Sequence, residues 1–426
     1  MISERALIAR YFHRFAFGPK PGQFKTSLAQ GSVATLKNLL NPAPNNSVSY
    51  PVFETLGPIP APGILRSEWS LKMRSQREQL YMWWLDLMAT TDNPFQERMV
   101  WFWHGHWATS IDKVEYANAM LVQNKIFRDF ATGNFADMAQ RMIMDGALQY
   151  WLDNNSNTIK APNENLAREL MELFTLGVNK YTETDIKQVA KALTGYTLDR
   201  ESGQVTFQPA KHDTSIQNIL GTNVNYDGKS LVTMLVGRND CTDFISKRLW
   251  FRFVNDLTDI QGNDIQNSFS GRDIFNTFKT LASHSALKSE DNSMVKPPLE
   301  WFIGACRSLN VLPSQLAKPT VTLNYLDKLA QKPFAPPNVG GWPSGEIWLT
   351  AANSQYRIEM AQLLVKAGDI NAIANTAITN RVSAVADLLG VGEWSSRTKS
   401  ALIASQSLPA QLVTTALCAP EYLVNI

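Results

Sequence analysis

The fold class follows most directly from residues 93–107, Asn93-Pro94-Phe95-Gln96-Glu97-Arg98-Met99-Val100-Trp101-Phe102-Trp103-His104-Gly105-His106-Trp107. An asparagine followed by a proline is typical of a helix start, with the asparagine as N-cap and the proline at the first helical position. Six of the twelve tryptophans lie between Trp69 and Trp107. This clustering predicts a helical segment within an aromatic core.

Helical patterns extend from this segment in both directions. The clearest helix frame follows Thr182, which can cap a helix together with Asp185 three residues later, and Gly195 ends the apolar repeat. Two short amphipathic helices are expected within residues 1–40, separated by the Gly-Pro-rich turn 17–22. Further helices are expected at about 67–89, 118–131, 135–145, 163–176, 183–194, 240–256, 272–284, 297–309, 321–331, 350–368, 381–389, 396–404 and 408–417.

Residues 196–235 have a different composition, in which apolar residues alternate with Gly, Asp, Asn and Pro. This pattern predicts a small β insertion of one or two hairpins. Residues 41–65 are rich in proline and are expected to form an irregular linker. The sequence therefore predicts a mainly α protein: one large helical domain spanning 1–426, with a small β-hairpin insertion.

The composition excludes several classes of function. The 40 basic and 38 acidic side chains nearly balance, so no global field favours nucleic acid. Three widely spaced cysteines form neither a disulfide framework nor a thiolate metal cage. We expect no transmembrane segment, because no apolar run reaches the roughly 18 residues of a span, and Met1–Leu7 lacks the apolar run of a signal peptide.

His104 and His106 are the first candidate functional residues. On a continuous helix, residues two apart point about 200° from one another and cannot bind one metal ion. In extended backbone they share a face, and Gly105 would permit such a break. Three interpretations stay open: a metal or ligand site, acid–base catalysis without metal, and two hydrogen-bonded core histidines.

The segment Pro162–Gly177 is the second candidate. Its helical pattern places Glu169 and Glu172 together on one flank of an apolar stripe, whereas Glu164 and Arg168 form an i, i+4 pair on the other side. Two such carboxylates can bind a metal or act as an acid–base couple, with Arg168 and Asn163 positioning a substrate. A charged, solvated helix flank is the competing interpretation.

Two loops complete the candidates. Lys211-His212-Asp213-Thr214 predicts a turn, and His212 and Asp213 are alternatively placed at the mouth of a cleft. The loop Phe334–Gly345 is rich in Pro and Gly, and Trp342, with Trp348 nearby, could stack on sugar rings or lie buried beneath the loop. The sequence contains no Gly-x-Gly-x-x-Gly after a strand, no P-loop, no His-Glu-x-x-His and no Gly-x-Ser-x-Gly.

These segments resemble, in order, a bacterial family of domains of unknown function, numbered 1800 (DUF1800). The resemblance runs along nearly the whole chain. It is carried by 7–19, 93–97, 102–110, 162–177, 181–183, 192–196, 212–213 and 336–342. The family implies an exported protein, periplasmic or secreted. It also implies a partner, encoded nearby, that is similar to sulfatases and phosphatases, and by analogy a role near polysaccharide.

Two principal hypotheses follow for the function. The first is a metal-assisted enzyme, a hydrolase or oxidase acting on an extracellular polymer or glycan. In it, His104, His106 and Glu169 are candidate ligands of a divalent metal, with Glu172 and Arg168 beside them. Asn163, Glu164, His212, Asp213 and Trp342 would contact the substrate. The second is a non-catalytic envelope binding or assembly protein in which the His/Glu cluster is a buried structural network. A glycan-binding scaffold that uses Trp342 and Trp348 is a third, weaker hypothesis.

Overall fold

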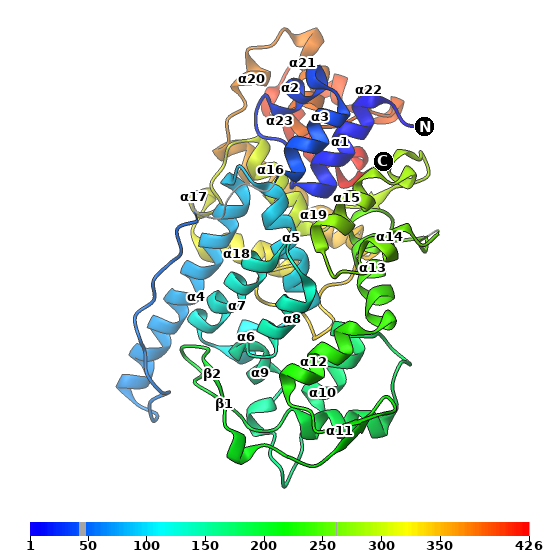
Figure 1. Ribbon diagram of the computed structural model, residues 1–426. Coiled ribbons are helices and arrows are strands. Elements are labelled where there is room, and N and C mark those ends of the chain that lie inside the picture. Colours follow the sequence, from blue (N-terminus) through cyan, green and yellow to red (C-terminus); the bar gives the residue numbers. More distant parts are fainter. Residues whose placement is uncertain (42–47, 261, 426) are drawn as a thin grey trace.

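Helices make up most of the protein, and the mainly α prediction is confirmed. The computed structural model describes residues 1–41, 48–260 and 262–425 (Figure 1). One continuous hydrophobic core extends from Leu7 near the N-terminus to Tyr422 near the C-terminus. Of the predicted proline-rich linker 41–65, residues 42–47 lie outside the described part of the chain.

The first helices pack against the last ones, so both ends of the chain lie in the same part of the molecule (Figure 1). Helix α1 contacts the C-terminal strand β6, and α2 contacts α21. The elements of this region are α1 (Glu4–Phe15), α2 (Gln23–Gln30), α3 (Ser32–Leu40), α20 (Asn371–Ala374), η7 (Ile378–Asn380), α21 (Arg381–Leu389), α22 (Ser396–Ser405), α23 (Pro409–Leu417), α24 (Pro420–Leu423) and β6 (Val424–Asn425).

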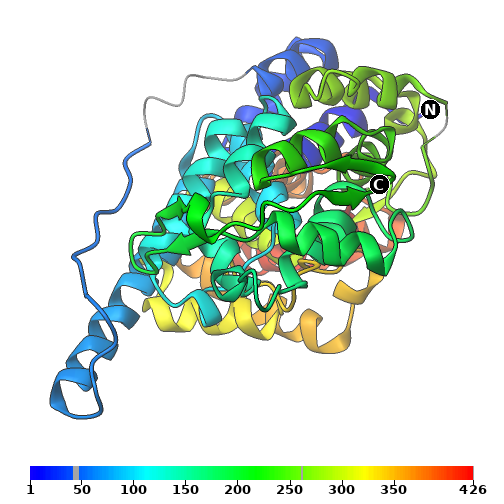
Figure 2. The same cartoon turned by 60° about the horizontal axis from the view of Figure 1, so that its bottom comes forward.

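Helix α5 lies at the centre of the molecule and contacts α1, α3 and α7. The long helix α4 packs on α7 and α16, whereas its first turns project from the body of the protein (Figure 2). The elements of this region are α4 (Ile64–Thr90), α5 (Pro94–His106), α6 (Ile111–Val114), α7 (Ala117–Phe130), α8 (Phe135–Met142), α9 (Gly146–Trp151) and η2 (Asn154–Ser156).

The predicted β insertion contains two antiparallel hairpins, whose registers pair Tyr196 with Phe207 and Gln217 with Val224. From Gly228 onward the chain is helical, because Asp227 caps α12 and the last residues of the predicted insertion belong to that helix. The elements here are α10 (Asn165–Glu169), η3 (Leu170–Thr175), α11 (Glu183–Ala192), β1 (Tyr196–Leu198), β2 (Val205–Phe207), η4 (Pro209–Lys211), β3 (Gln217–Ile219), β4 (Thr222–Val224) and α12 (Gly228–Gly237).

The remaining elements connect this region to the C-terminal helices. A short ladder pairs β5 with β6, matching Met294 with Asn425. These elements are α13 (Asn239–Phe253), α14 (Asp264–Ser268), α15 (Ile274–Ser283), η5 (Ser285–Lys288), β5 (Met294–Val295), α16 (Pro298–Ser308), α17 (Pro313–Leu316), α18 (Pro319–Lys328), η6 (Gly345–Trp348) and α19 (Ala351–Ala367).

The burial of α5 requires its charged residues to find partners inside the protein. Every residue of α5 except Gly105 is buried. Glu97 accepts hydrogen bonds from Arg128 Nε at 2.7 Å, Arg128 Nη2 at 2.8 Å and Trp84 Nε1 at 2.9 Å. Arg98 forms an ion pair with Glu300 at 2.5 Å. These contacts compensate the cost of burying charge and fix the rotation of α5 about its axis.

In the described part of the chain, no helix is both long enough and apolar enough to cross a membrane.

Candidate functional site

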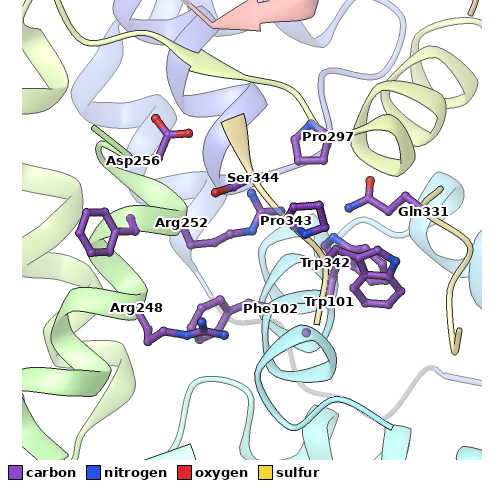
Figure 3. A pocket seen from close by; sticks show the side chains of 12 residues that line it. Trp101, Phe102, Arg248, Arg252, Asp256, Pro297, Gln331, Trp342, Pro343 and Ser344 are labelled. Atoms are coloured by element: carbon purple, nitrogen blue, oxygen red, sulfur yellow. The ribbon is translucent and has the colours of Figure 1, made fainter. Parts of the chain in front are cut away.

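A pocket with a volume of about 350 Å³ opens beside the C-terminal half of α5 (Figure 3). Helix α5, helix α13 with the residues that follow it, and the loop ending at Gly345 form its walls. The residues lining it are Trp101, Phe102, Gly105, Arg248, Phe251, Arg252, Asp256, Pro297, Gln331, Trp342, Pro343 and Ser344.

Gly105, the glycine between the two histidines, allows the loop 336–345 to pack directly on α5. Gly341 has φ +83°, and a side chain there would collide with the carbonyl oxygen of Gly105. Two glycines thus let the loop backbone contact the helix backbone directly. The adjacent Trp342 ring packs on Trp101, with ring centroids 4.6 Å apart, and is half-buried in the pocket wall. The predicted loop at 334–345 therefore serves to hold an aromatic wall.

His104 is a core residue on the side of α5 that faces Trp84. Its Nε2 accepts a hydrogen bond from the backbone N–H of Phe334 at 3.0 Å, and its ring packs against Trp84, Phe334 and Trp342. Burial lowers the pKa of His104 to about 3. The imidazole is therefore neutral at physiological pH and anchors the start of the 334–345 loop.

His106 points into a different part of the core. Its Nε2 donates to the carbonyl oxygen of Phe174 at 3.1 Å, and aromatic rings surround it, among them Phe102 and Phe244. Burial holds the pKa of His106 well below its usual range, and the nearby Arg248 lowers it further. Its Nδ1 has no hydrogen-bond partner among the described residues.

The two histidines do not converge, because α5 stays helical through Gly105. The expected set of His104, His106 and Glu169 is not assembled as a metal site. The described residues contain no group of three His, Cys, Asp or Glu side chains that could hold a metal ion.

The predicted helix at 163–176 is two elements, because its hydrogen-bond pattern widens to a π-helix from Leu170 to Thr175. Such π-helical turns are rare in proteins overall, but where they occur they are often at functional sites. Glu172 accepts a hydrogen bond from the hydroxyl of Tyr181. Glu169 is half-buried, and burial and the nearby Glu172 raise its pKa. The two carboxylates are therefore neighbours, as predicted, but neither lines the pocket.

The other predicted residues make local contacts. Arg168 donates to both carboxylate oxygens of Glu183, at 2.8 and 2.7 Å, and lies 3.7 Å from Glu164. Asn163 Nδ2 donates to the carbonyl oxygen of Asp153 at 3.3 Å.

His212 and Asp213 form a turn that is held by contacts to Thr194, which comes before them in the chain. Nδ1 of His212 lies 3.1 Å from the carbonyl oxygen of Thr194, and the Asp213 N–H donates to the Thr194 hydroxyl. Trp348 is buried beneath the loop and donates to the carbonyl oxygen of Pro343 at 3.2 Å. Of the predicted site residues, Trp342 alone is among those that line the pocket.

The pocket is dominated by two arginines of α13. Arg252 forms an ion pair with Glu300, which also holds Arg98. Arg248 is half-buried and has no hydrogen-bond or ion-pair partner within the described ranges, and burial lowers its pKa. A partly buried arginine without a counter-ion can be stabilised by a bound anion, with which it forms charge-assisted hydrogen bonds.

Asp256 is the one carboxylate among the residues lining this pocket. Burial raises its pKa, while Arg14 and Arg252 lower it. The described surroundings of the pocket therefore hold more positive than negative charge.

The sequence interpretation missed the arginines and Asp256. A signal was present, because Arg248 precedes and Arg252 interrupts the apolar residues 249–254, and arginine is rarely buried among apolar residues without a partner. One turn apart on a helix, Arg248 and Arg252 share a face.

Comparison with known families places the whole chain in one group. The family model described as "Protein of unknown function (DUF1800)" matches residues 10–424, so the chain belongs to this family. No curated protein matches the chain. No solved structure matches it either.

Proposed function

We propose that this protein binds an anionic sugar unit of a glycan in the pocket between α5, α13 and the 336–345 loop. The observation that carries the proposal is Arg248, a half-buried arginine that lines the pocket without a counter-ion among the described residues. We therefore place the ligand in this pocket, called the arginine pocket after Arg248 and Arg252, and not at the two histidines. The acidic group of the sugar would be a carboxylate, a sulfate or a phosphate.

The charge around the pocket supports this choice. Arg252 is oriented by Glu300, whose carboxylate it shares with Arg98. A planar guanidinium presents several donors in a fixed fork that matches the oxygens of such anions. Arg248 can therefore bind the anion directly, while Arg252 adds positive potential beside it.

The aromatic wall supports a sugar rather than a free inorganic anion. Trp342, Trp101, Phe102 and Phe251 all line the pocket, next to Pro343. Flat apolar faces pack against the C–H faces of sugar rings, and the indole N–H provides a polar handle.

A matched series of ligands tests the proposal. Isothermal titration calorimetry would compare glucose with glucuronate, glucose 6-sulfate and glucose 6-phosphate. We expect saturable binding of at least one charged sugar and not of glucose. In Arg248→Gln we expect this affinity to fall roughly ten- to a hundredfold, because a hydrogen bond to a charged group contributes roughly 1.5–3 kcal/mol.

Arg168→Gln is the control, since Arg168 is a surface arginine outside the pocket. An equal loss in both variants, equal binding of glucose, or the absence of binding by every member of the series would refute the proposal. The charged sugar that binds identifies the anionic group as a carboxylate, a sulfate or a phosphate.

Acid–base catalysis on the bound sugar is the second candidate, and it is favoured by Asp256. This carboxylate lines the pocket, and burial raises its pKa, so it is a group that can exchange a proton with a bound sugar. Incubation of the protein with charged oligosaccharides, followed by analysis of the products, tests for turnover. Asp256→Asn should abolish turnover while binding persists. If wild type binds these oligosaccharides and releases no product, the site only binds.

A further inference from the structure

Lys296 is a buried amine for which the protein supplies no acceptor. It precedes α16, its side chain is 2 % exposed, and its Nζ has no hydrogen-bond partner among the described residues. The Nζ lies 3.5 Å from the centroid of the Tyr422 ring, a cation–π contact. Its backbone N–H donates to the carbonyl oxygen of Leu423. The segment is therefore fixed, and the amine stays inside the fold.

The charges that act on Lys296 are themselves cations. Burial holds its pKa well below the usual range, and Arg357 and Arg98 lower it further. The nearest carboxylate along the chain, Glu300, is already engaged by Arg98 and Arg252. His13, on α1, is also affected by the charge of Lys296. A buried ammonium without an anion costs several kcal/mol, so this interior needs either a neutral amine or a negative charge.

Other donors around Lys296 also lack acceptors. The hydroxyl of Tyr422 and the Nε of Arg357 have no hydrogen-bond partner among the described residues. The Arg357 guanidinium is held against the same segment, because its Nη2 donates to the carbonyl oxygen of Lys296 at 3.4 Å. His13 packs edge-on against Tyr422, with centroids 5.6 Å apart, and donates from Nε2 to Gly390. Two residues in contact with Lys296 thus each carry a buried donor without an acceptor, as Lys296 itself does.

We propose that Lys296, with the Tyr422 hydroxyl and Arg357, binds a small inorganic anion of about the size of chloride inside the fold. A water molecule could accept the hydrogen bonds but would not compensate the positive charge, whereas a halide does both. Gly304 lies close to the Tyr422 hydroxyl. A side chain at Gly304 would come within 3.0 Å of the Tyr422 oxygen. This site is separate from the arginine pocket, which Lys296 does not line.

Crystallography of the wild-type protein with bromide in place of chloride tests the site directly. Bromide scatters anomalously, and we expect an anomalous peak within hydrogen-bonding distance of Lys296 Nζ. A water molecule at this place, or density for neither, would overturn the proposal.

Stability in solution gives a second readout. With chloride replacing gluconate at constant ionic strength, we expect a saturable upward shift of Tm for wild type. Lys296→Met should lose this shift, and Lys180→Met, a variant of an exposed lysine paired with Asp240, should keep it. The same chloride dependence in Lys296→Met would also refute the site. If Lys296→Met does not fold, the bromide crystal alone decides. Arg248→Gln should keep the chloride shift, which separates this site from the sugar pocket.

Discussion

At the scale of single residues, the His-Gly-His motif is built into the core. His104 accepts the N–H of Phe334, and His106 donates to the carbonyl oxygen of Phe174. Each therefore fixes one segment to α5. The hydrogen-bonded core was one of the three interpretations that the motif left open, and these contacts agree with it.

Replacement of His104 should change how stability depends on pH. Its pKa is about 3 in the folded protein and about 6.5 in an unfolded chain. Between these values the unfolded chain binds more protons, so folding stability falls as pH falls from 6.5 towards 3. In His104→Gln we expect this slope to become shallower by up to about 1.4 kcal/mol per pH unit. Urea unfolding at a series of pH values measures it.

The slope of folding stability against pH should be compared between the variant and wild type, because Asp145 contributes to that slope with the opposite sign. Burial raises the pKa of Asp145 to about 7. Between pH 4 and 7 the folded protein therefore binds more protons at Asp145 than the unfolded chain does, and the contribution of Asp145 to folding stability falls as pH rises from about 4 to 7. His284→Gln, at a half-exposed histidine whose pKa is also lowered, should change the slope less. A slope in His104→Gln equal to that of wild type would mean that His104 takes up a proton within the fold.

Single residues also show why most of the site escaped prediction. Trp342 was recognisable because prolines and glycines surround it. Arg248 and Asp256 lie in α13 or just after it, far in sequence from Gln331, and only the packing of α13 and the 336–345 loop on α5 brings these residues to one pocket. No local spacing encodes that convergence.

At the scale of elements, the helices predicted beyond residue 60 agree with the structure to within a few residues. Within residues 1–40 two helices were predicted and three are present, α1, α2 and α3, because Gly31, with φ +85°, separates α2 from α3. Predicted 183–194 is α11, Glu183–Ala192, and predicted 381–389 is α21, Arg381–Leu389. The signals there are local: a capping box at Thr182 and Asp185, and a glycine with positive φ after α21. The π-helix at Leu170–Thr175 was not predicted, because apolar periodicity does not distinguish hydrogen-bonding patterns within a helix.

The contact between the 336–345 loop and α5 should depend on Gly341. In Gly341→Ala the new methyl group would collide with the Gly105 carbonyl oxygen, and the backbone has φ +83°. We expect a loss of roughly 1–3 kcal/mol in unfolding free energy and a displaced Trp342. Denaturant unfolding and tryptophan fluorescence measure the two effects.

Gly237→Ala is the matched control, since no atom lies within 4 Å of the added methyl group. At the last residue of α12 this substitution should be neutral or slightly stabilising. If Gly341→Ala were as stable as wild type with an unchanged fluorescence spectrum, the loop would be free to move off α5.

At the scale of the whole molecule, one hydrophobic core connects helices from both ends of the chain. We therefore predict a single cooperative unfolding transition. Far-UV circular dichroism and tryptophan fluorescence should give the same midpoint, because the tryptophans are distributed from Trp69 to Trp394. Two separate midpoints would show that the chain unfolds in parts and would contradict the one-domain prediction.

The docking of α1 has a consequence for synthesis of the protein on the ribosome. Arg5 of α1 donates to the carbonyl oxygen of Gly392, and Arg10 to that of Leu287. Helix α1 is thus completed by a residue that lies 387 positions later in the chain. At translation rates of about 5–20 residues per second, the apolar face of α1 must wait roughly 20–80 s for Gly392. During that time a nascent chain of this kind depends on a holding chaperone, or on provisional contacts, to avoid aggregation.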